Sequence, residues 1–284
     1  MPIALITGAS SGIGQATALR LAGAGWTVLA GVRRKEDGER LAAEAPSGLV
    51  EPVLLDVTEL EQIRLVAARV SELGGGGESS PGRLDALVNN AGIGFGGPLE
   101  LISPEDLRTQ FDVNVLGQVA VTQALLPALR AARGRLLFVS SVGGRVAMAF
   151  TAPYAASKYA LEAIGDALRV ELSTSNVQVA LIEPGSVATP IWEKTREVEE
   201  KLTIPDSLRA EYGHVPAAMK KTIESTASRG VPPEQVAATI EAALTAKRMK
   251  ARYVIGRDAR AMIAMRRLLP DHVFDRVAKR ALGV

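Results

Sequence analysis

Three side chains between positions 141 and 158 have the types and spacing needed to move a proton to or from an oxygen atom. Tyr154 and Lys158 are four positions apart, so in a helix they lie on one face, one turn apart. A phenol has a pKa of about 10, and a nearby cation lowers it toward neutral pH, where a proton donor works best. Ser141 can hydrogen-bond the same substrate oxygen. These residues predict a general acid/base unit, although an isolated pair of this kind also occurs on ordinary surface helices.

A glycine-rich turn follows the first predicted strand and opens a predicted helix. Its glycines have the spacing GxxxGxG, which lets the backbone turn tightly and approach a ligand closely. The helix N-terminus beyond it offers free N–H groups and partial positive charge to a pyrophosphate. A tight strand-to-helix turn without a ligand is the alternative. The candidate cofactor ligands in this turn are Gly8, Ser10, Ser11, Gly12, Ile13 and Gly14.

The end of the second predicted strand, Thr27 to Val32, bears on which dinucleotide is bound. An acid at this point of a dinucleotide-binding fold accepts from the ribose 2′-hydroxyl, whereas an arginine suits a 2′-phosphate. Here Arg33 and two further basic residues follow the strand, and no acid occurs before Glu36. This favours NADP(H), with NAD(H) and a merely solvated basic turn as alternatives.

Two further polar residues are candidates for the site. Asp56, at the end of a third predicted strand, Val53 to Val57, is placed to reach an adenine or ribose edge. Asn114 lies in the apolar helical stretch FDVNVLGQVAV, where an unpaired amide is costly. It is either a satisfied core amide or one that holds a water or a backbone carbonyl near the site.

Composition limits the classes of function. The 284 residues are 47% hydrophobic and 23% charged, enough for one domain with a sizeable core. A net charge of +2 gives no clustered positive charge for nucleic acid. There are no cysteines, and two histidines far apart in sequence make a metal site unexpected. The N-terminus resembles a strand rather than a signal peptide, and the sequence has no run of about 18 apolar residues, so we expect a cytoplasmic protein without a membrane span.

Strands and helices alternate along the chain, which predicts an α/β fold with a parallel sheet covered on both faces. The predicted strands are Ile3–Thr7, Thr27–Val32, Val53–Val57, Leu84–Val88, Arg135–Ser140, Val177–Ile182 and Arg252–Ile255. We expect a single domain over residues 1–284, with a lid of short helices at about 186–230 and a basic amphipathic tail at about 259–284.

Taken together, the motifs resemble those of the short-chain dehydrogenase/reductase family, from Ile6 to Thr189 and more weakly beyond. They are, in family order, TGASSGIG at 7–14, Asp56, NNAG at 89–92, Asn114, Ser141, YAASK at 154–158 and PGSVAT at 184–189. The resemblance implies a Rossmann-type, doubly wound parallel sheet of about seven strands and a nicotinamide cofactor.

The resemblance also implies a role for each matching residue. Tyr154 would exchange a proton with the substrate oxygen, Lys158 would bind the nicotinamide ribose and lower the Tyr154 pKa, and Ser141 would position the carbonyl, with Ser140 as the alternative. Asn114 would hold a water that links Lys158 to solvent. The further cofactor contacts would be the glycine-rich turn, Arg33 with Ser11 at the 2′-phosphate, Asp56 and Val57 at the adenine, Asn90, Ala91 and Gly92 at the ribose, and Pro184, Gly185, Val187 and Thr189 near the nicotinamide.

The sequence therefore predicts an NADP(H)-dependent oxidoreductase that interconverts a ketone and a secondary alcohol. The stretches 140–172 and 181–194 are similar to the group of 17β-hydroxysteroid dehydrogenase type 1 and the retinol dehydrogenases, which favours a steroid-, retinoid- or lipid-like substrate. The apolar lid residues that would enclose it are Ile191, Trp192, Leu202, Ile204, Leu208, Val215 and Met219.

Two other functions stay open at this point. One is a reductase of 3-oxoacyl thioesters or of small carbonyls. The other is a redox-sensing regulator that binds NADP(H) without turnover. The family resemblance further suggests a homodimer or homotetramer, assembled through the helices near 104–130 and 153–172.

Overall fold

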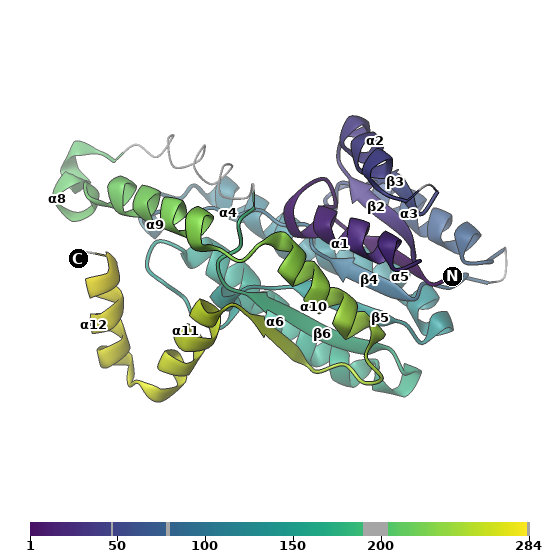
Figure 1. The fold of residues 1–284 in the computed structure, drawn as a ribbon. Helices are drawn as coiled ribbons and strands as arrows, with labels where there is room; N and C mark the ends of the chain where they lie inside the picture. Colours follow the sequence, from purple (N-terminus) through teal and green to yellow (C-terminus); the bar gives the residue numbers. More distant parts are fainter. Residues whose placement is uncertain (47, 78–79, 190–203, 283–284) are drawn as a thin grey trace.

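Seven strands pair in parallel, in the order β3-β2-β1-β4-β5-β6-β7 (Figure 1). This computed structural model describes residues 1–46, 48–77, 80–189 and 204–282. The strands are β1 Ile3–Ile6, β2 Thr27–Val32, β3 Val50–Leu54, β4 Ala86–Asn89, β5 Arg135–Val139, β6 Gln178–Pro184 and β7 Arg252–Ile255. The strand order reverses between β1 and β4, and open α/β sheets bind ligands at such a point. The predicted doubly wound fold is confirmed.

One strand lies elsewhere than predicted. The third strand runs over Val50–Leu54, with Val50 beside Val28 and Val53 beside Gly31, and not over Val53–Val57. Pro52 interrupts the apolar pattern, yet a proline is tolerated at a sheet edge, and β3 is an edge strand. Asp56 therefore lies in the loop beyond the strand.

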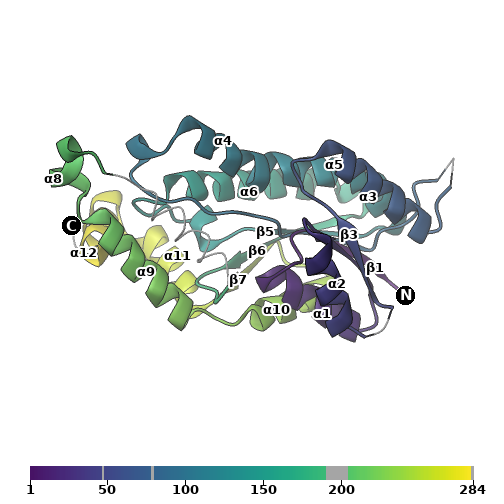
Figure 2. The ribbon, with the colours of Figure 1, turned by 90° about the horizontal axis from the view of Figure 1, so that it is seen from above.

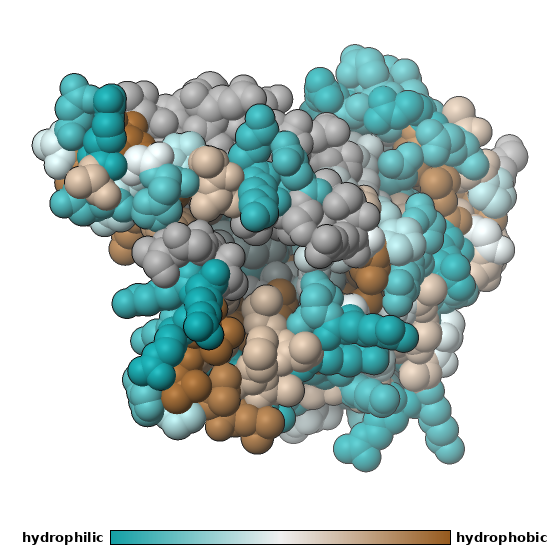
Figure 3. Space-filling model, turned by 60° about the vertical axis from the view of Figure 1, so that its left-hand side comes forward, coloured by the Kyte–Doolittle hydropathy of each residue, from teal (hydrophilic) through white to brown (hydrophobic). Residues whose placement is uncertain are grey.

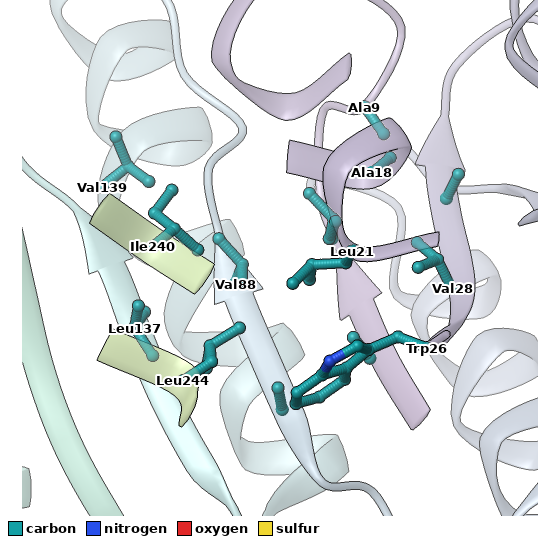
Figure 4. Packing of buried hydrophobic residues seen from close by; sticks show 14 of the residues in the cluster. Ala9, Ala18, Leu21, Trp26, Val28, Val88, Leu137, Val139, Ile240 and Leu244 are labelled. Atoms are coloured by element: carbon teal, nitrogen blue, oxygen red, sulfur yellow. The ribbon is translucent and has the colours of Figure 1, made fainter. Parts of the chain in front are cut away.

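Helices cover both faces of the sheet, as Figure 2 shows from above. The helices on one face are α1 Gly12–Gly23, α2 Lys35–Glu44 and α10 Pro233–Thr245. Those on the other are α3 Leu60–Leu73, α5 Gln118–Ala132 and α6 Ala152–Glu171. Successive strand residues point to opposite faces, so the sheet supplies two separate apolar cores. In the first core, Leu21 of α1 and Ile240 of α10 pack over Val88 (Figure 4).

The helical stretch that contains Asn114 is divided into three parts. Its first part, α4, is Pro104–Phe111, and the Ser103 Oγ accepts from the Asp106 N–H at 3.0 Å, as expected for a capping residue. A π-helical turn, η2, follows over Asp112–Gly117 and leads into α5. Such turns frequently mark functional sites.

Among the described residues, one helical stretch, Pro104–Ala132, has the length and hydropathy that a membrane span requires. Within the most apolar 18-residue window of this stretch, 44% is buried inside the structure. Helix α5 packs on α3 and β4. The stretch also carries buried amides that bind backbone within the domain. These contacts are those of a core helix. The expected cytoplasmic location stays a prediction.

The segment beyond β6 forms one end of the molecule (Figure 1). Its described helices are η5 Asp206–Leu208, α8 Arg209–Tyr212 and α9 Val215–Arg229. The prediction of short helices is wrong for α9, which is one continuous helix. Of the predicted lid residues, Val215 is buried and Ile204, Leu208 and Met219 are partly buried. The other three, Ile191, Trp192 and Leu202, lie outside the described residues.

The basic tail forms two helices, α11 Arg257–Leu268 and α12 Asp271–Leu282. Figure 3 shows this end of the molecule, where a hydrophobic patch is bordered by hydrophilic side chains. Among the residues of these helices whose side chains are described, the exposed large apolar ones are Met265, Leu268 and Val277. The tail therefore packs on the body through part of its surface only.

Candidate active site

A serine-bearing turn leaves the carboxyl end of β5. Ser141 precedes a single 3-10 turn, η3 Val142–Gly144, and its Oγ accepts from the Gly143 N–H at 3.0 Å. The side chain of Tyr154 packs against this turn, since a Cβ built on Gly143 would lie 3.2 Å from Tyr154 Cε1. Ser141 and Tyr154 are therefore neighbours, as the sequence predicted.

The tyrosine and the lysine both come from the first turns of α6, which begins at Ala152 with Pro153 in its first turn. Lys158 Nζ lies 5.7 Å from the centroid of the Tyr154 ring. The ammonium is buried and donates to the Val139 carbonyl at 2.9 Å. The helix thus holds a cation beneath the phenol and ties it to the end of β5.

Burial sets the acidity of both groups. It raises the pKa of Tyr154 above its usual value, and the hydrogen bond with the Ser141 hydroxyl lowers it in part. Burial also lowers the pKa of Lys158 to about 8, with the charge of Glu162 acting in the opposite direction. The pKa of Tyr154 is therefore not lowered overall, because burial dominates. The lowering contribution expected of Lys158 stays a prediction.

Asn114 lies in the π-helical turn and binds backbone. Its Nδ2 donates to the Ile93 carbonyl at 2.9 Å and to Ser157 Oγ at 3.0 Å, while Oδ1 accepts from the Ile93 N–H at 2.8 Å. The amide is thus satisfied, and its partner Ser157 is the residue before Lys158 on α6. That it also holds a water stays a prediction.

Two glutamines that sequence reasoning missed extend this arrangement. Gln110 accepts from the Phe95 N–H at 2.8 Å and donates to the Ile93 carbonyl at 2.6 Å. Gln118 donates to the Ala91 carbonyl at 2.6 Å. With Asn114 they form a row of buried amides four residues apart, and that spacing in an apolar helix was the available signal. The row fixes the loop that follows β4.

The loop after β4 is also tied to the glycine-rich turn. Asn90 Nδ2 donates to the carbonyls of Thr7 and Gly8 at 2.9 and 3.0 Å, and the Thr7 hydroxyl accepts from the N–H of Asn90 and Ala91 at 2.9 Å. A Cβ on Gly14 would lie 2.2 Å from the Gly8 carbonyl oxygen, so no side chain fits there. Gly8 itself has a φ of 64°, which favours glycine.

The glycine-rich turn fits a dinucleotide phosphate. Ser11 caps α1 without a side-chain hydrogen bond to the helix among the described residues, and the first turn of α1 contains no acid. Its first N–H groups are therefore available to an anion. On the far side, a Cβ on Gly92 would lie 3.3 Å from Asn114 Oδ1 and 3.7 Å from Lys158 Nζ, so bare backbone approaches the lysine there.

The end of β2 carries exposed positive charge beside this turn. Arg34 and Arg40 both pair with Asp37, at 3.0 and 3.1 Å, and Arg40 reaches the Ser10 carbonyl at 3.5 Å. Arg33 is exposed and makes no ion pair with any described residue. Arg33 is thus free to bind a 2′-phosphate. Arg40, which sequence reasoning missed, reaches the glycine-rich turn.

Asp56 has a local bonding role that the sequence did not predict. Its Oδ1 accepts from the N–H and the hydroxyl of Thr58, at 3.0 and 2.7 Å, and so shapes the turn into α3. Val57 is buried, and its carbonyl would lie 2.6 Å from a Cβ on Gly117. The adenine contact expected of both residues stays a prediction.

The PGSVAT segment lies at the end of β6, held by the C-terminal part of the chain. Gly185 N–H donates to the Ile255 carbonyl at 2.9 Å, and Ser186 N–H donates to Asp258 Oδ2 at 2.8 Å. Val187 is buried, and Thr189, the last described residue before position 190, is partly buried. The carboxyl ends of β1, β4, β5 and β6 therefore bring the predicted site residues to one edge of the sheet.

Comparisons with known proteins agree with this geometry. The family model for the short chain dehydrogenase matches residues 2–200. The chain is 34% identical over 282 residues to the NADPH-dependent 3-dehydrocapnine reductase of Ornithobacterium rhinotracheale, covering 98% of this chain and 96% of that protein. It is 37% identical over 279 residues to retinol dehydrogenase 16 of Homo sapiens, covering 96% of this chain and 86% of that protein.

A solved structure shows the same likeness. The crystal structure of a short-chain dehydrogenase from Streptomyces avermitilis superposes with a TM-score of 0.78 at 30% identity, covering 98% of this chain and 95% of that one. The likeness therefore continues past residue 200, through α9 to the C-terminal helices.

Proposed function

Because the chain belongs to the short-chain dehydrogenase family, we propose that it interconverts a ketone and a secondary alcohol, with NADP(H) as the preferred cofactor. The observation that carries this proposal is the cluster of Ser141, Tyr154 and Lys158 at the carboxyl end of β5, beside the bare backbone of Gly92. A protein that only binds the cofactor has no need of a buried acid/base pair, which argues against the regulator alternative.

The residues of the chain divide the proton chemistry between them. A bound nicotinamide supplies the hydride for reduction or accepts it in oxidation. Burial keeps Tyr154 protonated at neutral pH, so its hydroxyl can give a proton to the substrate oxygen. Ser141 hydrogen-bonds that oxygen and stabilises its developing charge. The Lys158 cation stabilises the phenolate that remains on Tyr154.

Arg33 is the residue on which the NADP(H) preference depends. In Arg33→Ala we expect NADPH to bind about 10- to 100-fold more weakly, because one charge-assisted hydrogen bond to phosphate contributes about 1.5–3 kcal/mol. NADH, which lacks the 2′-phosphate, should bind as before. Titration of both cofactors by fluorescence or calorimetry measures the difference.

The matched control is Arg130→Ala, an exposed arginine on α5, on the opposite face of the sheet from α2. It should change neither affinity. Equal affinity of the wild type for NADH and NADPH would contradict the proposed preference and direct the search to NAD(H)-dependent oxidation.

An apolar substrate is the finer part of the proposal. Val215 at the start of α9 is buried, and Met219 lies against the loop after β4, since a Cβ on Gly96 would be 2.9 Å from Met219 Cε. The ring of His214 packs edge-on against Phe150, with centroids 6.4 Å apart. These contacts lie beside the loop after β4 and beside Phe150, which supports an apolar substrate. The name of the relative retinol dehydrogenase 16 supports the same choice.

A panel of ketones tests this substrate class. We expect kcat/KM with NADPH to rise by about tenfold or more from a short aliphatic ketone to a long-chain, steroid or retinoid carbonyl, since each buried methylene adds about 1 kcal/mol of binding. The panel includes a 3-oxoacyl thioester. A preference for that thioester, or for small ketones, would replace the apolar substrate by the alternative reductase function.

We also propose assembly into a homo-oligomer through the helices near 104–130 and 153–172, which are α4, η2, α5 and α6. Their outer faces expose the large apolar side chains of Leu107, Leu116 and Val170. α6 packs against α4 and η2, and exposed apolar side chains on neighbouring helices support an interface there. The sites at the carboxyl edge of the sheet do not lie on these faces, so each protomer would keep its own site.

A further inference from the structure

Two buried glutamates lie behind the catalytic lysine, and the proposed mechanism does not use them. Glu162 is on α6, one turn after Lys158, and is 5% exposed. Glu183 is the penultimate residue of β6 and is fully buried. Burying a carboxylate is costly unless it is paired and hydrogen-bonded, so the partners of these two residues matter.

Two arginines lie against the pair. Arg252 of β7 points its Nε at both carboxyls, 2.9 Å from Glu162 Oε2 and 3.0 Å from Glu183 Oε1. Arg145, which follows η3, contacts Glu183 Oε1 at 3.1 Å. Asp166 of α6 accepts from Arg252 Nη2 at 2.6 Å. These cations would repel a metal ion from the pair.

One carboxyl oxygen of each glutamate takes no part in these ion pairs. Among the described residues, neither Glu162 Oε1 nor Glu183 Oε2 has a hydrogen-bond partner, although both are buried. Buried polar atoms of a folded protein nearly always have one. A single proton held between the two carboxyls would satisfy both oxygens at once. Burial, and then the charge and hydrogen-bonding of Glu162, raise the pKa of Glu183 to about 7, which agrees with a shared proton.

The pair is in contact with the catalytic turn. A Cβ on Gly144 would lie 2.7 Å from Ser140 Oγ and 3.0 Å from Glu162 Cγ, so the turn that begins at Ser141 rests directly on Glu162. Arg145 ties the end of the same turn to Glu183. On the other side, the charge of Glu162 raises the pKa of Lys158. The pair thus reaches both the serine turn and the lysine.

We propose that Glu162 and Glu183 form a buried acid pair that shares one proton at neutral pH and acts as a positioning unit, holding the Ser141 turn on β6 and keeping Lys158 charged. The groups that face it are Arg145 from the catalytic turn, Arg252 from β7, and Lys158 and Asp166 from α6. The catalytic part rests on the proposed function, whereas the shared proton does not.

The shared proton gives stability a defined pH dependence. The folded protein keeps a proton on Glu183 that the unfolded chain releases above about 4.5, so the pair's contribution to stability falls as pH rises from about 4.5 to about 7 and is constant above that. Glu183→Gln replaces the shared proton by a permanent N–H donor to Glu162. The melting temperature of Glu183→Gln should therefore lack the part of the pH dependence that the shared proton causes between about 4.5 and about 7.

Infrared spectroscopy of the purified full chain tests the proton directly. At pH 6 to 7 we expect a band of a protonated carboxylic acid that is lost in Glu183→Gln and also in Glu162→Gln. Glu171→Gln, an exposed glutamate on the same helix, should keep it. If the wild type has no such band, or if the band survives both substitutions, the shared proton is refuted.

The positioning role is tested by kinetics. Above about pH 7 the wild-type pair carries two negative charges, while Glu183→Gln keeps one, so the lysine should lose its proton at lower pH in the variant. We expect kcat of Glu183→Gln to stay within about threefold of wild type at pH 7 and its alkaline limb to move to lower pH. If the alkaline limb of the pH–rate profile is at the same pH in Glu183→Gln as in the wild type, the coupling to Lys158 is refuted. Absence of turnover in the wild type refutes the proposed function and leaves the infrared result to decide the acid pair.

Discussion

Tyr154→Phe is expected to lower kcat by about three orders of magnitude while NADPH still binds. The substitution removes only the hydroxyl, and a positioned general acid contributes about 10²- to 10⁴-fold. The Ser141 turn packs on the tyrosine ring, which phenylalanine retains, so the fold and the cofactor turn should be unaffected. Single-turnover measurement with preformed NADPH complex separates the chemical step from binding.

Tyr159→Phe is the matched control for this result. Tyr159 is on the same helix, five residues later, and is 44% exposed. Removing the Tyr159 hydroxyl should leave kcat unchanged. If Tyr154→Phe keeps more than about a tenth of wild-type kcat, another group donates the proton and the assignment of Tyr154 is incorrect.

The sequence was sufficient for the fold and for the placement of its polar motifs because local rules decide both. Alternation of apolar strands with amphipathic helices determines a parallel sheet, and the carboxyl ends of its strands carry the polar motifs. The GxxxGxG spacing at 8–14 has a local cause, since only glycine fits against the Gly8 carbonyl. Tyr154 and Lys158 share a helix face through their spacing alone.

Contacts between distant segments were beyond sequence reasoning. No local pattern indicates that Lys158 bonds the Val139 carbonyl or that Glu162 meets Glu183 across α6 and β6. For the same reason the sequence led us to expect a lowered Tyr154 pKa, whereas burial raises it. The spacing predicts the nearby cation, but burial depends on which residues pack around the ring. Strand β3 was misplaced because the tolerance of Pro52 depends on β3 being an edge.

Lys158→Met is the second change for which we expect a large effect. The ammonium is buried and carries a pKa of about 8, lowered chiefly by burial, so it is charged at neutral pH. Methionine has a similar length and no charge, so kcat should fall by about 10²-fold or more as the phenolate left on Tyr154 loses its cation. The Val139 carbonyl also loses its donor, which costs about 1–3 kcal/mol of stability.

The pH dependence identifies the lysine independently of the size of this loss. In the wild type, reduction should slow above about pH 8, roughly tenfold per unit, as Lys158 releases its proton. Because the unfolded lysine, at 10.5, holds its proton longer than the folded one, its contribution to stability rises from about pH 8 to 10.5. Lys158→Met should lack both the kinetic limb and this rise, and the exposed Lys247→Met should keep both. An alkaline limb that persists in Lys158→Met would show that another group, and not the lysine, controls the rate.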